Sequence, residues 1–347
     1  MAEHSECMAT RLIALDWGTS ALRAFRLGGS GEVLETRHRP WGILSLPPAA
    51  DGMADPAPGA AFEGALQGIC GDWLAANPGL PLLACGMVGS AQGWREAAYL
   101  PTPASLDALA RGLMLVERRD GPPLHIVPGL LQQGTLPNVM RGEETQVLGV
   151  LAGLALPADA PVLIGLPGTH SKWVLARGGR IEQFHTFMTG EVFAALRGHT
   201  ILGKTMQTAA VPDDTAFARG LDVARGSDAA LGLLSHLFST RTLGLTGALA
   251  PAAQADYLSG LLIGHEVAGL ARAQQQGAAT PQRLVLCGEP DLCRRYAMAL
   301  QAYGFATPAI ATQATAPGLW QIALAAGLVS AEATLSSVNP ATGSPTA

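Results

Sequence analysis

The chain has 347 residues, of which 48% are hydrophobic and 14% are charged, and its formal net charge is −5. This length and apolar content allow a large buried core divided between two domains. The mild negative charge, without a cluster of Lys and Arg, excludes an electrostatic surface for nucleic acid, and every apolar run is shorter than the about 20 residues of a membrane helix.

The N-terminus and the cysteines predict a cytoplasmic protein. The first residues, MAEHSECMATRLIALDWG, place acids before the apolar run and show neither a cationic flank nor a small-residue cleavage site, so we expect no signal peptide. The five cysteines include no C-x-x-C pair, which argues against a disulfide framework and a structural zinc site. Small-molecule chemistry is therefore the expected function class.

The first part of the chain is predicted to be mixed α/β. RLIALDWG and ALRAFRL are apolar runs separated by a short gap, which predicts a β-hairpin over residues 11–27. AAFEGALQGICGDWLAAN, residues 60–77, has the apolar spacing of a helix. PLLACG and LHIVPG, residues 81–86 and 124–129, predict short buried strands.

The second part repeats this pattern. RGEETQVLGVLAGLAL, residues 141–156, predicts a helix with acids in its first turn, and PVLIGL predicts a strand. KWVLARGGRIEQF then predicts strand, turn and strand. The remaining predicted elements are helices over 254–277, 291–304 and 318–331, a strand over 283–288, and a disordered tail over 331–347.

One stretch, GHTILGKT at Gly198 to Thr205, matches the phosphate-binding pattern G-x-x-x-x-G-K-[ST] in full. A true P-loop lies between a buried strand and a helix N-terminus. Here the preceding GEVFAALR has helical spacing, and the following MQTAAVPDD soon reaches Pro212. We therefore expect a helix end at Gly198 and a turn at Gly203, and keep a P-loop ATPase using Lys204 and Thr205 as the alternative.

A shorter motif, LDWGTS, offers what a bound triphosphate needs. Gly18 lets the backbone approach a ligand closely. Thr19 and Ser20 supply hydroxyl and N–H donors, and Asp16 at a strand end can hold the water shell of Mg²⁺. The alternative interpretation is an ordinary turn stabilised by its Asp side chain.

A second motif of this kind, LPGTHSK, strengthens the phosphate interpretation. It places Gly168 and Thr169 in another strand-turn-strand, as expected if two similar half-domains hold a polyphosphate from both sides. His170, beside Thr169, is a further candidate for a phosphate contact, although a lone histidine is more often structural.

The order DWGTS, GEETQVLG, PGTHSKW and LVLCGEP resembles that of the sugar kinases with the actin, hexokinase and heat-shock-protein ATPase fold. A closer resemblance, to the 2-dehydro-3-deoxygalactonokinases, rests on IALDWGTSALRAF, GMVGSAQGW, NVMRGEETQ, PGTHSKWV, MTGE and YLSGLLIGHEV. It implies an α/β fold of two ribonuclease-H-like domains with a central cleft, divided as residues 1–141 and 142–330. This division leaves open whether the last predicted helix, residues 318–331, packs against the first domain.

The resemblance also implies an activity. The chain would use ATP and Mg²⁺ to phosphorylate the terminal 6-hydroxyl of 2-dehydro-3-deoxy-D-galactonate, in galactonate and galactose breakdown. Both hairpins would line the β- and γ-phosphates, and Gly288 in LVLCGEP would let adenosine lie against backbone. A kinase for a related 2-keto-3-deoxy sugar acid and a non-catalytic sugar sensor are the alternatives. The oligomeric state stays open, with a homodimer among the options.

The acceptor hydroxyl needs a carboxylate to take its proton, and Glu143 and Glu144 are the candidates. Glycerol-kinase-like relatives have Gly-Asp-Gln here, and counting back from Gly149 places their Asp nearer Gly142, which favours Glu143. Both acids also suit a helix N-terminus without any catalytic role. Pro167 replaces the Asp of many relatives, so we expect no metal at the second hairpin.

The carboxylate of the acceptor calls for a planar cation. Arg95 is the first choice, because it follows a strand and a Gly-rich loop where a sugar could lie. Trp94 suits either a substrate contact or the core, and each cation also suits a solvated surface. The candidates for acceptor binding are Arg23, Ser90, Trp94, Arg95 and Arg141, with Lys172 a further nearby cation.

Overall fold

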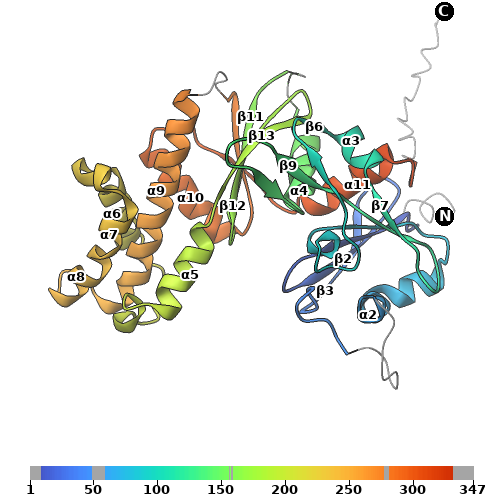
Figure 1. Ribbon diagram of the computed structural model, residues 1–347, viewed down its shortest axis with the longest axis horizontal. Coiled ribbons are helices and arrows are strands. Elements are labelled where there is room, and N and C mark those ends of the chain that lie inside the picture. The colour runs from blue at the N-terminus through green and yellow to red at the C-terminus, as the bar shows by residue number, and fades with distance from the viewer. Residues whose placement is uncertain (1–8, 49–58, 156, 158, 277–280, 331–347) are drawn as a thin grey trace, which may run out of the picture.

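The computed structural model describes residues 9–48, 59–155, 157, 159–276 and 281–330. These residues form an elongated molecule with two sheet-bearing halves and a helical lobe next to the second of them (Figure 1). The predicted disordered tail, residues 331–347, lies outside the described residues, as do residues 1–8 with Cys7.

The first half is built on a six-stranded sheet in the order β3-β2-β1-β4-β8-β7. Its strands are β1 (Leu12–Trp17), β2 (Leu22–Leu27), β3 (Val33–Arg39), β4 (Leu82–Cys85), β7 (Met114–Val116) and β8 (Leu124–Ile126). β1 pairs antiparallel with β2 and parallel with β4, and β4 is parallel to β8. The predicted N-terminal hairpin is therefore confirmed.

The second half repeats this arrangement in the order β15-β14-β11-β12-β13-β6. Its strands are β6 (Ala104–Ser105), β11 (Val162–Leu166), β12 (Ser171–Arg177), β13 (Arg180–Phe187), β14 (Arg283–Cys287) and β15 (Ala309–Ala311). β11 pairs antiparallel with β12 and parallel with β14, as β1 does with β2 and β4. The predicted α/β fold of two ribonuclease-H-like halves is confirmed.

Successive side chains of a strand point to opposite faces of its sheet. In the central strands of both sheets, each face is covered by a hydrophobic core. In β1, Ala14 belongs to the core between the two sheets, whereas Leu15 packs under α2 (Ala60–Ala76). In β12, Val174 faces the same middle core and Trp173 faces the helices on the far side. Helices and sheets thus alternate in layers along the molecule.

The middle layer consists of α4 (Glu143–Ala152) and α11 (Thr315–Ala325), which lie between the sheets (Figure 1). They cross closely because glycines face the partner backbone. A Cβ on Gly149 would lie 1.8 Å from the carbonyl oxygen of Ala314, and one on Gly318 would lie 1.9 Å from that of Thr145. α11 also contacts β1 and β4 of the first sheet. The predicted domain boundary at residue 142 stays a prediction.

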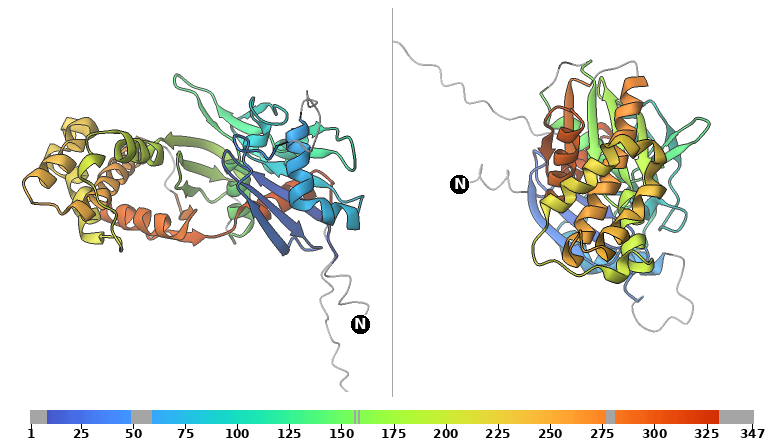
Figure 2. Two further views of the ribbon diagram at one scale, coloured as in Figure 1. Left: turned by 90° about the horizontal axis from the view of Figure 1, so that it is seen from below. Right: turned by 90° about the vertical axis from the view of Figure 1, so that its left-hand side faces the viewer.

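The outer layer is the helical lobe, in which α9 contacts each of its neighbours α5, α6, α7, α8 and α10. Figure 2 shows these helices from the end of the molecule. The helices are α5 (Thr189–His199), α6 (Asp214–Arg225), α7 (Gly232–Leu237), α8 (Ser239–Leu245), α9 (Gln254–Gln276) and α10 (Pro290–Ala302). The other elements are α3 (Leu106–Arg111), β5 (Tyr99–Pro101), β9 (Gly129–Gln132), β10 (Asn138–Met140) and the 3₁₀ turns Met87–Gly89, Gly203–Thr205, Ser227–Leu231 and Pro251–Ala253.

The predicted helices exist, but several of their ends differ. α4 stops at Ala152, ahead of Gly153, and the predicted end at 156 lies outside the described residues. α10 begins at Pro290, since proline suits the first turn of a helix. α11 spans Thr315–Ala325 and therefore starts and ends earlier than predicted. Within the described residues, no helix is long and apolar enough to cross a membrane.

Candidate active site

The candidate site lies where α4 begins, between the inner faces of the two sheets. Asp16 occupies the same face of β1 as Ala14, and Lys172 the same face of β12 as Val174, because side chains alternate along a strand. Both faces belong to the core that contains α4. The end of β1 and the start of β12 therefore bring a carboxylate and an ammonium group toward the α4 N-terminus.

The first hairpin has a tightly held turn. The Gly18 N–H donates to the carbonyl of Ala21 at 2.9 Å. The N–H groups of Ile43 and Leu44 donate to the carbonyls of Gly18 and Thr19 at 3.0 and 3.2 Å. The backbone of the turn is thus fixed on one side by residues 43 and 44, a support that the sequence did not reveal.

The polar side chains of this hairpin differ in exposure. Thr19 and Ser20 are exposed. Asp16, at the end of β1, has a side chain that is 17% exposed and pairs with the guanidinium of Arg23 from β2. The predicted phosphate and metal residues of LDWGTS therefore lie together at one end of the first sheet.

The start of α4 requires a glycine. Gly142 has a φ of 107°, which L side chains rarely adopt, and a Cβ there would lie 3.2 Å from the Cα of Gly86. The two acids that follow fold back onto the helix N-terminus. Glu143 Oε2 accepts from the N–H of Arg141 at 3.0 Å, and Glu144 Oε2 accepts from that of Gly142 at 2.7 Å.

Glu144 is fully buried, and its Oε1 accepts from the Thr145 hydroxyl at 3.1 Å. Burial, and next the charge of Glu143, raise the pKa of Glu144 to about 7. Burial also raises the pKa of the Cys85 thiol at the end of β4, followed by the charges of Asp16 and Glu144. The charges of both carboxylates therefore reach this thiol.

Glu143 is more open and is paired across the two halves. Its side chain is 27% exposed, and its Oε1 lies 3.2 Å from Nζ of Lys172, whose own side chain is 5% exposed. The ion pair joins the start of α4 to the second hairpin. Solvent access thus distinguishes Glu143 from the buried Glu144, a choice that the sequence left open.

The N-terminus of α5 packs directly on the second hairpin. A Cβ on Gly190 would lie 2.4 Å from the carbonyl oxygen of Gly168 and 2.8 Å from Cα of Thr169. The Glu191 N–H donates to the carbonyl of Thr169 at 3.0 Å, and its carboxylate lies 2.5 Å from Nε2 of His170. The exposed Thr169 and His170 side chains therefore stand on a fixed backbone.

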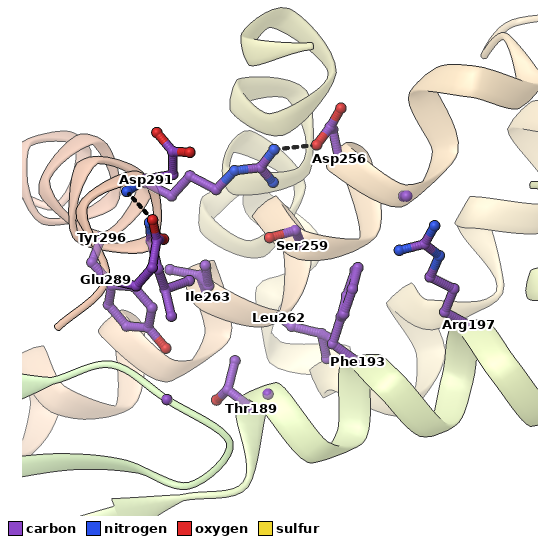
Figure 3. A pocket seen from close by; sticks show the side chains of 15 residues that line it. Thr189, Phe193, Arg197, Asp256, Ser259, Leu262, Ile263, Glu289, Asp291 and Tyr296 are labelled. Carbon is purple, nitrogen blue, oxygen red and sulfur yellow. Dashed lines mark hydrogen bonds and ion pairs between the residues drawn. The ribbon is translucent and has the colours of Figure 1, made fainter. Parts of the chain in front are cut away.

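A pocket of about 350 Å³ opens beside this hairpin, between α5, α9 and α10. Gly168 lines it on the hairpin side. Phe193 of α5 and Leu262 and Ile263 of α9 supply apolar walls, and Figure 3 shows Phe193 and Arg197 projecting from α5 toward α9. Such a concave, mainly apolar space beside polar donors is typical of a small-molecule site.

The loop after β14 borders the same pocket. A Cβ on Gly288 would lie 3.3 Å from the carbonyl oxygen of Pro167, so this predicted adenosine contact adjoins the second hairpin. Glu289 follows and caps α10, because its carboxylate accepts from the N–H groups of Asp291 and Leu292 at 3.2 and 2.9 Å. The pocket is therefore continuous with the phosphate-binding candidates.

A buried network connects the pocket wall to the second hairpin. Tyr296 is one of the residues that line the pocket, and its buried hydroxyl donates to Glu266 Oε2 at 2.7 Å and lies 2.8 Å from Oγ of Ser171. Trp173 Nε1 donates to Glu266 Oε1 at 2.7 Å. Burial raises the pKa of Glu266. The first residues of β12 are thus tied to both α9 and α10.

The family model described as 2-keto-3-deoxy-galactonokinase matches residues 16–322 of the chain. The chain belongs to this family. It is therefore a kinase, and the match includes both hairpins, the start of α4 and the pocket.

Named relatives agree with this assignment. A probable 2-dehydro-3-deoxygalactonokinase of Rhizobium meliloti (strain 1021) is 37% identical over 313 residues, 88% of this chain and 94% of that protein. The 2-dehydro-3-deoxygalactonokinase of Escherichia coli (strain K12) is 34% identical over 305 residues, again 88% of this chain and 94% of that protein. A crystal structure of a protein from Sinorhizobium meliloti, proposed to be a 2-dehydro-3-deoxygalactonokinase, superposes with a TM-score of 0.75 at 35% identity, covering 90% of this chain and 98% of that one.

Two of the residues predicted to bind the acceptor, Arg141 and Ser90, are buried near each other. Arg141 is buried, donates to the carbonyl of Ala97 at 2.8 Å and stacks over Tyr99. A Cβ on Gly89 would lie 3.1 Å from Arg141 Nη1, and the buried Ser90 follows it. Within the described residues, Ser90 Oγ and Arg141 Nη1 lack a hydrogen-bond partner, which is unusual for buried polar groups.

The other acceptor candidates have different surroundings. Arg95 is exposed. Trp94 stacks on Phe62, with ring centroids 5.7 Å apart, and meets Trp17 edge-on, which agrees with its alternative role in the core. Arg23 is engaged with Asp16 of the first hairpin. The roles of all these residues in binding stay predictions.

The P-loop match does not form a phosphate loop in the kinase. The expected helix end at Gly198 is wrong by one residue, because α5 continues to His199 and the chain becomes extended only at Thr200. The predicted turn is present as a 3₁₀ turn, Gly203–Thr205. Lys204 is exposed, and the Thr205 hydroxyl donates to Gln254 at 2.8 Å. As predicted, a helix and not a strand precedes the motif.

The sequence reasoning missed the walls of the pocket and the pairing of Lys172 with Glu143. A signal was present for the pocket: MTGE contains Thr189 and Gly190, and YLSGLLIGHEV contains Ser259 of α9. The ion pair had no local signal, because its partners lie on different elements.

Proposed function

We propose that the chain transfers the γ-phosphoryl group of ATP to the 6-hydroxyl of 2-dehydro-3-deoxy-D-galactonate and releases the 6-phosphate and ADP. Family membership and the names of the relatives support the reaction. The observation that carries the proposal is the pair of Glu143 and Lys172. It places an accessible carboxylate at the start of α4, beside the second hairpin.

We place adenosine in the pocket between α5, α9 and α10, where apolar side chains would contact the base. From there the phosphates would extend past Gly288 to the second hairpin. Gly168 and Thr169 would donate N–H and hydroxyl groups to the phosphate oxygens. Thr19 and Ser20 would do the same from the first hairpin. Two open hairpins at facing ends of the sheets support this placement.

Asp16 fits a role in holding Mg²⁺ through water. Its carboxylate is partly exposed at the end of β1, next to the turn that would meet the phosphates. Protein sites for Mg²⁺ with nucleotides commonly use one or two carboxylates, while phosphates and waters complete the shell. When bound, the metal would neutralise charge on the transferring phosphoryl oxygens.

In the reaction, the acceptor oxygen bonds to the γ-phosphorus while the bond from that phosphorus to the bridging oxygen of ADP breaks. The hydroxyl proton passes to Glu143, which has solvent access and is held by Lys172 and the Arg141 N–H. Glu144 serves the structure of the helix start. Arg141 and Ser90 each carry a buried polar atom that has no hydrogen-bond partner among the described residues, and they are the best placed to meet the polar end of the acceptor.

An acceptor panel tests the proposal. Release of ADP from ATP would be measured with 2-dehydro-3-deoxygalactonate, its gluconate epimer and related sugar acids. We expect kcat/KM for the galactonate form to be at least about tenfold higher than for the epimer, because one misplaced hydroxyl leaves a polar group of the site unpaired. Equal or better use of the epimer would contradict the acceptor assignment.

We further propose that the enzyme acts in the cytoplasm, in the breakdown of galactonate.

Filling the pocket should weaken ATP binding. Ser259 of α9 is one of the pocket's lining residues. For Ser259→Trp we expect KM for ATP to rise at least about tenfold, with acceptor KM changed by less than about threefold, since the indole would occupy the adenosine space. Steady-state kinetics with each substrate varied measures this. Gln275→Trp, at an exposed position of the same helix, is the matched control and should change neither value.

A further inference from the structure

Lys172 is an unusual lysine, because its charged group lies inside the molecule. Its side chain is 5% exposed, and Lys172 is the second residue of β12, on the face that meets α4. Burying an ammonium group is costly unless it is paired and hydrogen-bonded. Nζ lies 3.2 Å from Glu143 Oε1 and donates to the carbonyl of His170 at 3.5 Å. Its surroundings are therefore a carboxylate of α4 and the backbone of the second hairpin.

Each carboxylate oxygen of Glu143 has its own contact. Its Oε2 accepts from the Arg141 N–H, at the end of the loop that leads into α4. Its Oε1 is held by Lys172, which belongs to the other sheet. A long, partly exposed Glu side chain has several rotamers, and two contacts on its two oxygens reduce that freedom. The geometry of the carboxylate therefore depends on the position of β12.

The same end of β12 is anchored on its opposite face to the pocket. Ser171, adjacent to Lys172, points the other way and lies 2.8 Å from the Tyr296 hydroxyl. Tyr296 lines the pocket and donates to the buried Glu266. Two consecutive residues thus connect the wall of the pocket with the carboxylate at the start of α4.

We propose that Lys172 is a positioning residue for phosphoryl transfer, whose ammonium group holds Glu143 against the second hairpin so that the base and the γ-phosphate are aligned. This inference rests on the proposed function, since it takes Glu143 as the base and the second hairpin as a phosphate site. Lys172 acts through Glu143 and has no need to touch the acceptor. Its loss should therefore lower kcat and leave both substrate affinities almost intact.

The test is a double-mutant cycle measured by steady-state kinetics. The proteins are wild type, Lys172→Met, Lys172→Arg, Glu143→Gln and the double variant Lys172→Met with Glu143→Gln. For Lys172→Met we expect kcat to fall about 100-fold, with KM for ATP and acceptor within about threefold of wild type. Lys172→Arg keeps the charge, and its kcat should be at least about tenfold higher than that of Lys172→Met. In the Glu143→Gln background, Lys172→Met should cost less than about twofold, because the residue acts through Glu143.

Several results would overturn the inference. One is a double variant in which Lys172→Met lowers the kcat of Glu143→Gln by as large a factor as it lowers the kcat of the wild type. Another is a rise in KM for ATP with kcat preserved, which would make Lys172 a phosphate ligand. Wild-type kcat in Lys172→Met would also overturn it. If Lys172→Met does not fold, as shown by its thermal unfolding, Lys172→Gln, which is also uncharged but keeps a polar end, replaces it in the same cycle. A wild-type protein that phosphorylates no acceptor would instead refute the proposed function.

Discussion

Glu143→Gln is expected to lower kcat about a thousandfold, the scale of losing a general base that also orients the acceptor hydroxyl. The substitution keeps the shape of the side chain and removes its ability to take a proton. KM for ATP should stay within about threefold, because the pocket and the second hairpin are unchanged. Steady-state rates of ADP release, at saturating ATP and acceptor, measure the loss.

Glu144→Gln is the matched control from the neighbouring position. Both oxygens of Glu144 are engaged inside the protein, with the Gly142 N–H and the Thr145 hydroxyl, and the side chain is fully buried. We therefore expect kcat to fall less than about tenfold. A thousandfold loss in Glu144→Gln, with near wild-type activity in Glu143→Gln, would reverse the assignment of the base.

Glu144 has a second, independent signature in the pH dependence of stability. Its folded pKa is raised from 4.5 to about 7, so the folded protein binds this proton more tightly than the unfolded chain. The wild type should therefore lose stability as pH rises from about 4.5 to about 7. The change is up to about 3 kcal/mol at about 1.4 kcal/mol per pKa unit. Urea unfolding measures this at about pH 5 and about pH 8. The free energy of unfolding of Glu144→Gln, relative to that of the wild type, should be higher at the higher pH.

Gly190→Ala should damage the nucleotide site. The new Cβ would lie 2.4 Å from the Gly168 carbonyl oxygen and 2.8 Å from Cα of Thr169, both backbone atoms of the second hairpin. The hairpin or the start of α5 must shift, at a cost of about 1–3 kcal/mol in the free energy of unfolding. We expect KM for ATP to rise at least about tenfold, with a lower kcat. Kinetics and urea unfolding measure the two effects.

Gly198→Ala, on the same helix, is the control. A Cβ there meets no atom within 4 Å, so the substitution should leave activity unchanged and stabilise the helix by up to about 1 kcal/mol. It also tests the P-loop alternative, in which Gly198 would be the first glycine of the phosphate loop. Lost activity in Gly198→Ala, with unchanged KM for ATP in Gly190→Ala, would contradict the placement of the nucleotide.

Much of the fold followed from local pattern. The apolar runs that became β1, β11 and β12 are mostly buried on both faces of their sheets, so their sequences are largely hydrophobic. β2, LRAFRL, is only partly buried and carries two arginines between its apolar residues. β3 was missed because its sequence, VLETRHR, is mostly polar. One of its two arginines, Arg37, pairs with Glu35 and Asp72. α7 and α8 were missed because helices of 6 and 7 residues are too short for a reliable periodicity.

Part of the candidate site could be recognised in the sequence. The two hairpins and the acids of α4 are short motifs with distinct residue types, and these could be recognised. The ion pair of Glu143 and Lys172 could not, because it depends on the distance between two sheets that only the folded chain defines. The pocket is likewise assembled from three separate helices. Long-range packing, which no local spacing encodes, therefore sets the difference in burial between Glu143 and Glu144 on which the proposed base rests.

The most direct test of the proposed reaction is the position of the phosphate in the product. Purified protein would be incubated with ATP, Mg²⁺ and 2-dehydro-3-deoxygalactonate, and the product examined by ³¹P and ¹H NMR. We predict one phosphate ester per ADP released, with the phosphorus coupled to the two protons on carbon 6. A phosphate on another hydroxyl, or inorganic phosphate released in place of the ester, would contradict the proposed function.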